Sequence, residues 1–186
     1  MIHYSVLMEH NEESLQDLAH MQYDLFCQSN RIGRSVLSFG ALIAGVINYT
    51  KWWGILLIFY GSYIGSSKYA AANHTARKLV KQLKAAEMPF PASNYVFRDH
   101  EMEIITLPER KTFGTLKYAQ VSRMGENADH FFLFRDQYGG YMIPKEELGD
   151  NVDAFRTFVE KKTGQTFRAR KAPMVRLMER FRRKRR

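Results

Sequence analysis

The sequence of 186 residues has few of the features that mark an enzyme or a secreted protein. It holds one cysteine, Cys27, so no intramolecular disulfide is expected, which is consistent with a reducing compartment. It has no GxSxG, Walker-type, dinucleotide-binding or HExxH motif. Its first residues lack a basic segment followed by an apolar run, so we expect no cleaved signal peptide. These absences argue against an enzyme, and we expect no catalytic residue, no cofactor and no metal ion.

Charge is almost absent from residues 35–67, where Lys51 is the one charged side chain. A turn around residues 48–51 would divide this stretch into two helices that are apolar on all sides, which is typical of helices without a solvent-facing side. A membrane span needs about 20 apolar residues, and both runs are shorter. On length alone, a hairpin buried in a soluble core is therefore the alternative to a membrane hairpin.

The residues that flank these two runs favour the membrane. Trp52 and Trp53 lie at the turn, where an aromatic belt would be, while Arg31, Arg34 and Lys68 lie at the opposite ends of the two runs. By the positive-inside rule, this distribution places both termini in the cytoplasm. The sequence therefore predicts a transmembrane helical hairpin with two spans in the cell membrane.

Small residues four positions apart occur on both predicted helices, at Gly61 and Gly65 and at Ala41 and Gly45. Such spacing lets two helix backbones approach closely. It predicts close packing, either within the hairpin or between two copies of the chain.

The excess positive charge is confined to the C-terminal tail. Residues 168–186 contain ten Lys and Arg and one acid, and the rest of the chain is balanced. Apolar residues recur in the tail at helical spacing, which predicts a basic amphipathic helix on an anionic lipid surface. Its candidate membrane-binding residues are Arg176, Arg180, Arg182, Arg183, Lys184, Arg185 and Arg186. A disordered solubilising tail and contact with RNA are the alternatives, nucleic acid being the least favoured.

The other segments predict an α+β protein with cytoplasmic extensions of the hairpin. We expect a strand and an amphipathic helix in residues 1–34, with Asn11 as the helix cap, and a cytoplasmic helix in residues 68–88. The basic side of that second helix could meet lipid headgroups, acids of the chain or solvent. After a Pro-rich break, residues 89–165 contain short alternating strands and a final helix that stops at Gly164, which predicts a small antiparallel β-barrel capped by a helix. The tail occupies residues 166–186.

Polar pairs that could do chemistry are weak candidates. These pairs are His20 with Asp24, Glu101 with Glu103, and Ser122 with His130. We interpret them as surface or solvated groups, because the sequence pattern offers no third group that would complete a site.

Short packing and turn patterns occur at residues 95–97, 116–121, 131–134 and 141–145. Through these patterns the chain resembles the YcxB-like family of bacterial membrane proteins. It implies an N-terminal strand and helix, a membrane hairpin and a C-terminal pleckstrin-homology-like domain over most of residues 1–165. It implies no catalytic residues.

Two functions follow as hypotheses. The first is a non-enzymatic integral membrane protein whose cytoplasmic β domain binds protein or lipid or associates with itself, while the basic tail contacts anionic lipid. Its partners would be anionic membrane lipid, a protein at the cytoplasmic face, or a second copy of the chain. The second is an immunity protein that protects against a membrane-active toxin or bacteriocin.

Overall fold

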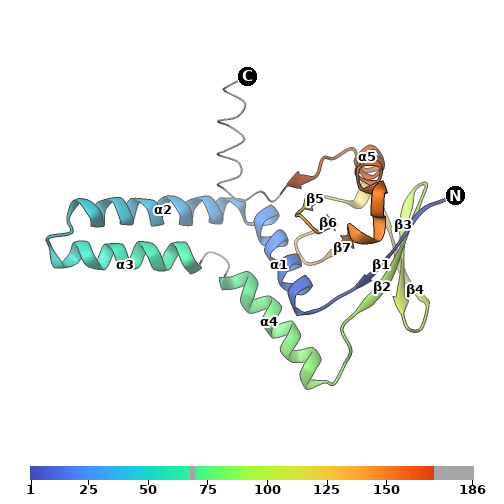
Figure 1. Cartoon of the computed structure of the whole chain (residues 1–186), viewed down its shortest axis with the longest axis horizontal. Helices are drawn as coiled ribbons and strands as arrows, with labels where there is room; N and C mark the ends of the chain where they lie inside the picture. Colours follow the sequence, from blue (N-terminus) through green and yellow to red (C-terminus); the bar gives the residue numbers. More distant parts are fainter. Residues whose placement is uncertain (68–69, 170–186) are drawn as a thin grey trace. The chain divides into compact units, whose positions relative to one another are not determined.

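The computed structural model describes residues 1–67 and 70–169 (Figure 1). The chain divides into two compact units. Residues 11–89 form the first, here called the helical unit, and residues 1–10 together with those from Phe90 onward form the second, here called the β unit. The helical unit is therefore inserted between the first strand of the β unit and the rest of that unit.

The helical unit contains four described helices: α1 (Glu12–Phe26), α2 (Gln28–Ile47), α3 (Trp52–Ser66) and α4 (Ala70–Ala85). The predicted cap at Asn11 is confirmed, because the backbone N–H of Ser14 donates to Asn11 Oδ1 at 2.7 Å. The Ser14 hydroxyl in turn accepts from the Asn11 backbone N–H at 2.8 Å, which completes a capping box. α1 packs on α4, and α2 packs along α3.

The predicted transmembrane hairpin is wrong. Among residues 1–67 and 70–169, no helix combines the length and the apolar character that crossing a membrane requires. The fifteen residues of α3 give a length of about 22 Å, less than the roughly 30 Å of a bilayer's hydrocarbon core. α2 has twenty residues, but it begins with the polar run Gln28-Ser29-Asn30-Arg31, so its apolar part is shorter. The predicted two-span location in the cell membrane, with both termini cytoplasmic, is overturned by the same finding.

The β unit consists of two four-stranded sheets and short helices. The first sheet has the order β1-β2-β3-β4 and is antiparallel throughout. The second has the order β7-β6-β5-β8, in which β5 and β8 run parallel and the other pairs antiparallel. The strands are β1 (Ile2–Glu9), β2 (Ala92–Arg98), β3 (Glu101–Leu107), β4 (Lys111–Lys117), β5 (Arg123–Glu126), β6 (His130–Phe134), β7 (Gly140–Pro144) and β8 (Arg168–Ala169).

The helices of the β unit are η2 (Tyr118–Gln120), η3 (Glu146–Asn151) and α5 (Val152–Thr163). The predicted stop at Gly164 is confirmed: this residue has a left-handed backbone, and its N–H donates to the carbonyl of Glu160 at 2.9 Å. The unit is thus α+β with two sheets, one of them mixed, and the single antiparallel barrel that we predicted is not what the structure contains.

The core of the β unit forms around Phe155 of α5, which is fully buried. Its ring lies 4.9 Å from that of Phe97 on β2, 5.2 Å from that of Tyr4 on β1 and 5.4 Å from that of Phe131 on β6. One side chain of α5 therefore contacts strands of both sheets. β1 and β2 pair with Val6 opposite Tyr95, so the first ten residues belong to the same unit as the C-terminal half of the chain.

Candidate functional site

The hairpin of α2 and α3 is held together by close backbone approaches at glycine. A Cβ at Gly61 would lie 2.9 Å from the carbonyl oxygen of Ser38, and one at Gly45 would lie 2.8 Å from that of Gly54. The Ser38 hydroxyl also donates to the carbonyl of Gly61 at 2.7 Å in a buried position. These contacts require residues without a side chain, so the two helices pack along their glycines.

The sequence pattern predicted four residues that pack the two helices together. In the structure only two of them lie between the helices. Gly45 and Gly61 lie between the helices, Gly65 is exposed and faces only the Ser38 side chain, and Ala41 is half-buried. Gly54, which the spacing rule did not identify, is the most crowded, because a Cβ there would lie 2.0 Å from the carbonyl oxygen of Asn48. The signal that could have found it is its position three residues after Lys51, the last residue of the tight turn.

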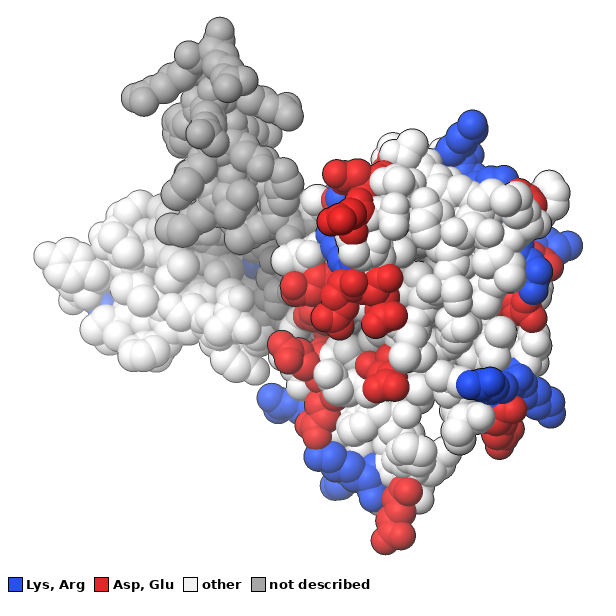
Figure 2. Space-filling model, turned by 45° about the vertical axis from the view of Figure 1, so that its right-hand side comes forward, with Lys and Arg blue, Asp and Glu red and all other residues white. Residues whose placement is uncertain are grey.

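The outer surface of the hairpin is strongly apolar. Fifteen of the twenty-one large apolar residues that are exposed in the described structure belong to α2, α3 or their turn. They include Phe39 at 66% exposure and Phe59 at 70%, one on each helix. Figure 2 shows the visible part of the hairpin almost entirely white, whereas red and blue side chains are scattered over the rest of the visible coloured surface. Single exposed apolar side chains are ordinary on a protein surface, but this hairpin exposes many of them on two adjacent helices.

The turn of the hairpin combines aromatic and cationic side chains. Trp52 is 75% exposed and Trp53 is 36% exposed, and Lys51 Nζ lies 5.6 Å from the centre of the Trp53 ring. At the opposite, open end, Arg34 Nη1 donates to the carbonyl of Ser67 at 3.4 Å. The side chain of Arg31, Lys68 and the tail residues from Arg176 to Arg186 lie outside what the structure describes.

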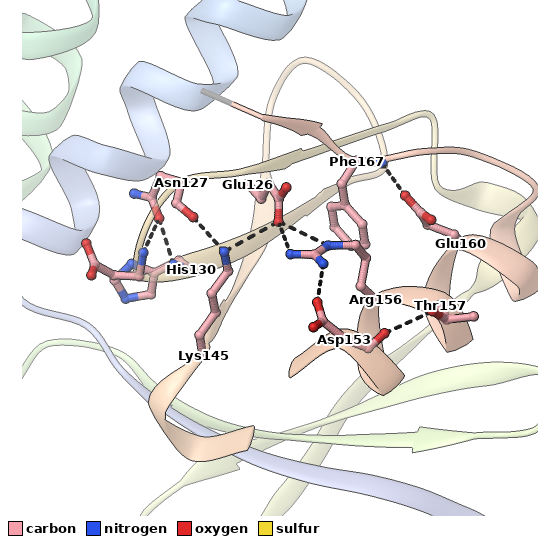
Figure 3. Close-up of polar contacts among 10 residues, drawn as sticks. Glu126, Asn127, His130, Lys145, Asp153, Arg156, Thr157, Glu160 and Phe167 are labelled. Atoms are coloured by element: carbon pink, nitrogen blue, oxygen red, sulfur yellow. Dashed lines mark hydrogen bonds and ion pairs between the residues drawn. The ribbon is translucent and has the colours of Figure 1, made fainter. Parts of the chain in front are cut away.

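A cluster of charged side chains lies in the β unit, between β5, β7 and α5 (Figure 3). Glu126 Oε2 accepts from Arg156 Nη2 at 3.0 Å and from Lys145 Nζ at 3.4 Å. Lys145 Nζ also donates to the carbonyl of Asn127 at 2.7 Å, and Arg156 pairs with Asp153. Partial burial disfavours the charged Arg156, but its bonds to Glu126 and Asp153 outweigh this and raise the pKa of the guanidinium.

This cluster has the character of a structural element. The side chains of Glu126 and Lys145 are about five-sixths buried, and each charge faces a partner of opposite sign. Lys145 Nζ also lies 4.7 Å from the centre of the Phe131 ring, so the cluster rests on the core. The sequence reasoning missed it, since its members are separated by up to thirty positions.

Comparison with known proteins bears on this part of the chain. Residues 104–159 match the model of a family described as YcxB-like protein. This segment is similar to the YcxB-like family. The resemblance drawn from the sequence is therefore confirmed over these residues, which run from within β3 to within α5. No curated protein and no solved structure matches the chain.

The YcxB-like segment contains the charge cluster and the core residue Phe155, whereas the hairpin lies outside it. The match thus concerns the scaffold of the β unit. It assigns no activity to any residue.

The polar pairs considered from the sequence have other partners in the structure. His20 Nε2 lies 2.5 Å from Asn73 Oδ1 on α4, so this side chain joins α1 to α4. Glu103 accepts from Arg98 at 2.7 Å and from the Thr112 hydroxyl at 3.0 Å, and the bond from Arg98 lowers its pKa. The Ser122 hydroxyl donates to the carbonyl of Phe134 at 3.2 Å. Within residues 1–67 and 70–169, no three His, Cys, Asp or Glu side chains form a group that could hold a metal ion.

Proposed function

We propose that this chain is a non-catalytic binding protein whose helical hairpin attaches it to a phospholipid surface. The observation that carries the proposal is the exposed apolar surface of α2 and α3. The attachment is to one side of a lipid surface and involves no crossing of it.

The size of the apolar surface supports a binding role. Contiguous apolar patches larger than a few hundred Å² are rare on monomeric proteins and mark interaction sites. Each Å² of apolar surface removed from water contributes about 25 cal/mol, so covering even part of the hairpin would be strongly favourable.

The distribution of the apolar residues favours lipid over a groove on another protein. A helix that docks in a protein groove needs one apolar face, with polar residues on the other. On α3, Ile55 and Tyr60 are both exposed and lie about 140° apart around the helix axis, and the helix contains no charged residue. Acyl chains can cover such a helix on all of its free sides.

The turn supports the same proposal. Tryptophan places an apolar ring and a polar N–H at the level of lipid headgroups, and lysine can extend its amine to the phosphates. Lys51, Trp52 and Trp53 combine these properties in three successive residues.

The β unit would then be the part of the protein that the attachment holds at the surface, where it is available to a protein partner. The charge cluster and the aromatic core make it a rigid scaffold, because their side chains satisfy one another. The basic tail, which lies outside the described residues, would add attraction to anionic lipid through its charge alone.

Flotation of the full chain with phospholipid vesicles tests the proposal. We compare wild type with the double variant Phe39→Gln/Phe59→Gln, since glutamine keeps helix propensity while it removes apolar surface. The matched control is Phe113→Gln/Tyr138→Gln, which removes two exposed aromatic residues from the β unit. We expect the hairpin variant to bind at least about tenfold more weakly, because it lacks two exposed rings that the lipid would cover, and the control to stay within about twofold of wild type. Equal binding of both variants, or no flotation of the wild type, would contradict the proposal.

A further inference from the structure

α4 has two faces with different partners. Ala72, Ala76 and Val80 are buried, each less than a tenth exposed, and this side of the helix packs on α1. The pair between His20 of α1 and Asn73 of α4, together with the ion pair between Glu12 of α1 and Lys84 of α4, extends this contact. The orientation of α4 within the helical unit is thereby fixed.

The other face of α4 is basic. His74, Arg77, Lys78 and Lys81 are spaced by three and four residues, so they fall on one side of the helix, and all four are exposed. With Ser66, Ala70 and Asn73 they line an open hollow on the surface of the helical unit. Because Ser66 is the last residue of α3, this hollow lies at the open end of the hairpin, opposite the turn.

The charge of this face is not neutralised by the described part of the chain. α4 contains no acidic residue, and Glu12 is paired with Lys84. Among residues 1–67 and 70–169, no ion pair or hydrogen bond involves the side chain of Arg77, Lys78 or Lys81. The sequence left three possible surroundings for the cations of α4: lipid headgroups, acids of the chain, or solvent. In the structure Lys84 pairs with an acid of the chain, whereas the side chains of Arg77, Lys78 and Lys81 are available to a ligand.

We propose that this basic face binds the phosphate groups of anionic phospholipids, so that α4 selects the charge of the lipid surface to which the hairpin attaches. The inference rests on the proposed function of the hairpin. A row of cations next to an apolar hairpin matches an anionic lipid surface, in which phosphates overlie acyl chains. A nucleic acid would use the cations but would leave the adjoining apolar surface in water.

Vesicle flotation of three forms of the full chain tests this inference. The first is wild type, the second is Arg77→Gln/Lys78→Gln/Lys81→Gln, and the third is the charge-matched control Lys111→Gln/Lys117→Gln/Lys161→Gln in the β unit. Each variant loses three positive charges from exposed positions and keeps the basic tail, so a difference between the variants reports on α4. The vesicles are phosphatidylcholine with or without phosphatidylglycerol, at low and at high salt.

We expect the α4 variant to bind phosphatidylglycerol vesicles at least about tenfold more weakly than the control at low salt, with a smaller difference at high salt. On pure phosphatidylcholine the two variants should bind equally. An additional variant, Arg77→Lys, keeps the charge and should bind as wild type does. Circular dichroism should show unchanged helix content in all of these proteins.

Three results would overturn the inference. The first is binding of the α4 variant to phosphatidylglycerol vesicles within about twofold of the control. The second is a loss of oligonucleotide binding by the α4 variant while its vesicle binding is unchanged, which would assign the face to nucleic acid. The third is failure of the wild type to bind either vesicle, which would remove the hairpin proposal together with this one, whereas the first two leave the hairpin proposal standing.

Discussion

Phe155 is the residue on which the packing of the β unit depends most. It is fully buried, and its ring contacts rings from three strands in two sheets. We predict that Phe155→Ala lowers the free energy of unfolding by about 3–5 kcal/mol, through lost burial and the cavity left behind. Urea unfolding followed by far-ultraviolet circular dichroism measures this. The control Phe113→Ala removes a ring that is 81% exposed and should change stability by less than about 0.5 kcal/mol; equal effects of the two substitutions would refute the assigned core.

His10 makes the stability of the β unit depend on pH. Burial, and secondarily the nearby His130, lowers its pKa below the ordinary value of 6.5. Between these two pKa values the unfolded chain binds more protons than the folded chain, so stability falls as pH drops below about 6.5 and is unaffected by this group above it. We predict that wild type loses more stability than His10→Gln between about pH 7.5 and pH 5.5. Parallel losses in the two proteins would show that His10 does not titrate as described.

At the scale of elements, the turn between α2 and α3 depends on Gly54. A Cβ there would lie 2.0 Å from a backbone oxygen of Asn48, which cannot move without opening the turn. We predict that Gly54→Ala destabilises the hairpin by at least about 1–3 kcal/mol, the usual cost of overpacking. The change should appear in thermal melts followed by tryptophan emission, because both tryptophans lie in the first turn of α3, close to Gly54 in the sequence.

Gly40 is the matched control for this substitution. It lies on the free side of α2, and a Cβ there would meet no atom within 4 Å. Alanine should be neutral or stabilising by up to about 1 kcal/mol, since it is the better helix former. A similar loss of stability at both glycines would mean that helix propensity, not packing, explains the first result.

Local signals in the sequence predicted the start of α1 at Asn11 and the end of α5 at Gly164, because capping depends on neighbouring residues alone. They did not predict that β8 pairs with β5 in parallel, since this pairing joins Gly125 to Arg168 and depends on the whole β unit. The error over the transmembrane hairpin arose from composition. The two runs are apolar, but both are shorter than a membrane span requires. The polar residues at the start of α2 leave that helix with a shorter apolar part than its full length.

At the scale of the whole molecule, the β unit is built from two separate segments of the chain, with the helical unit inserted after His10. The candidate site could be predicted only in part. The apolar character of the hairpin and its tryptophans could be predicted from the sequence. The basic face of α4 could not, because the sequence does not show that Lys84 pairs with Glu12 while, within the described residues, Arg77, Lys78 and Lys81 pair with no acid.

The most direct test of the central claim uses the chain's two tryptophans, Trp52 and Trp53, which are the first residues of α3 and lie next to the hairpin turn. Their fluorescence is recorded while phosphatidylcholine–phosphatidylglycerol vesicles are added to the full chain, once with ordinary lipids and once with lipids brominated on the acyl chains. We predict a shift of the emission to shorter wavelength with ordinary lipids and strong quenching with brominated ones, because the rings leave water for the lipid. Emission that keeps its wavelength and intensity in both titrations would contradict attachment through the hairpin.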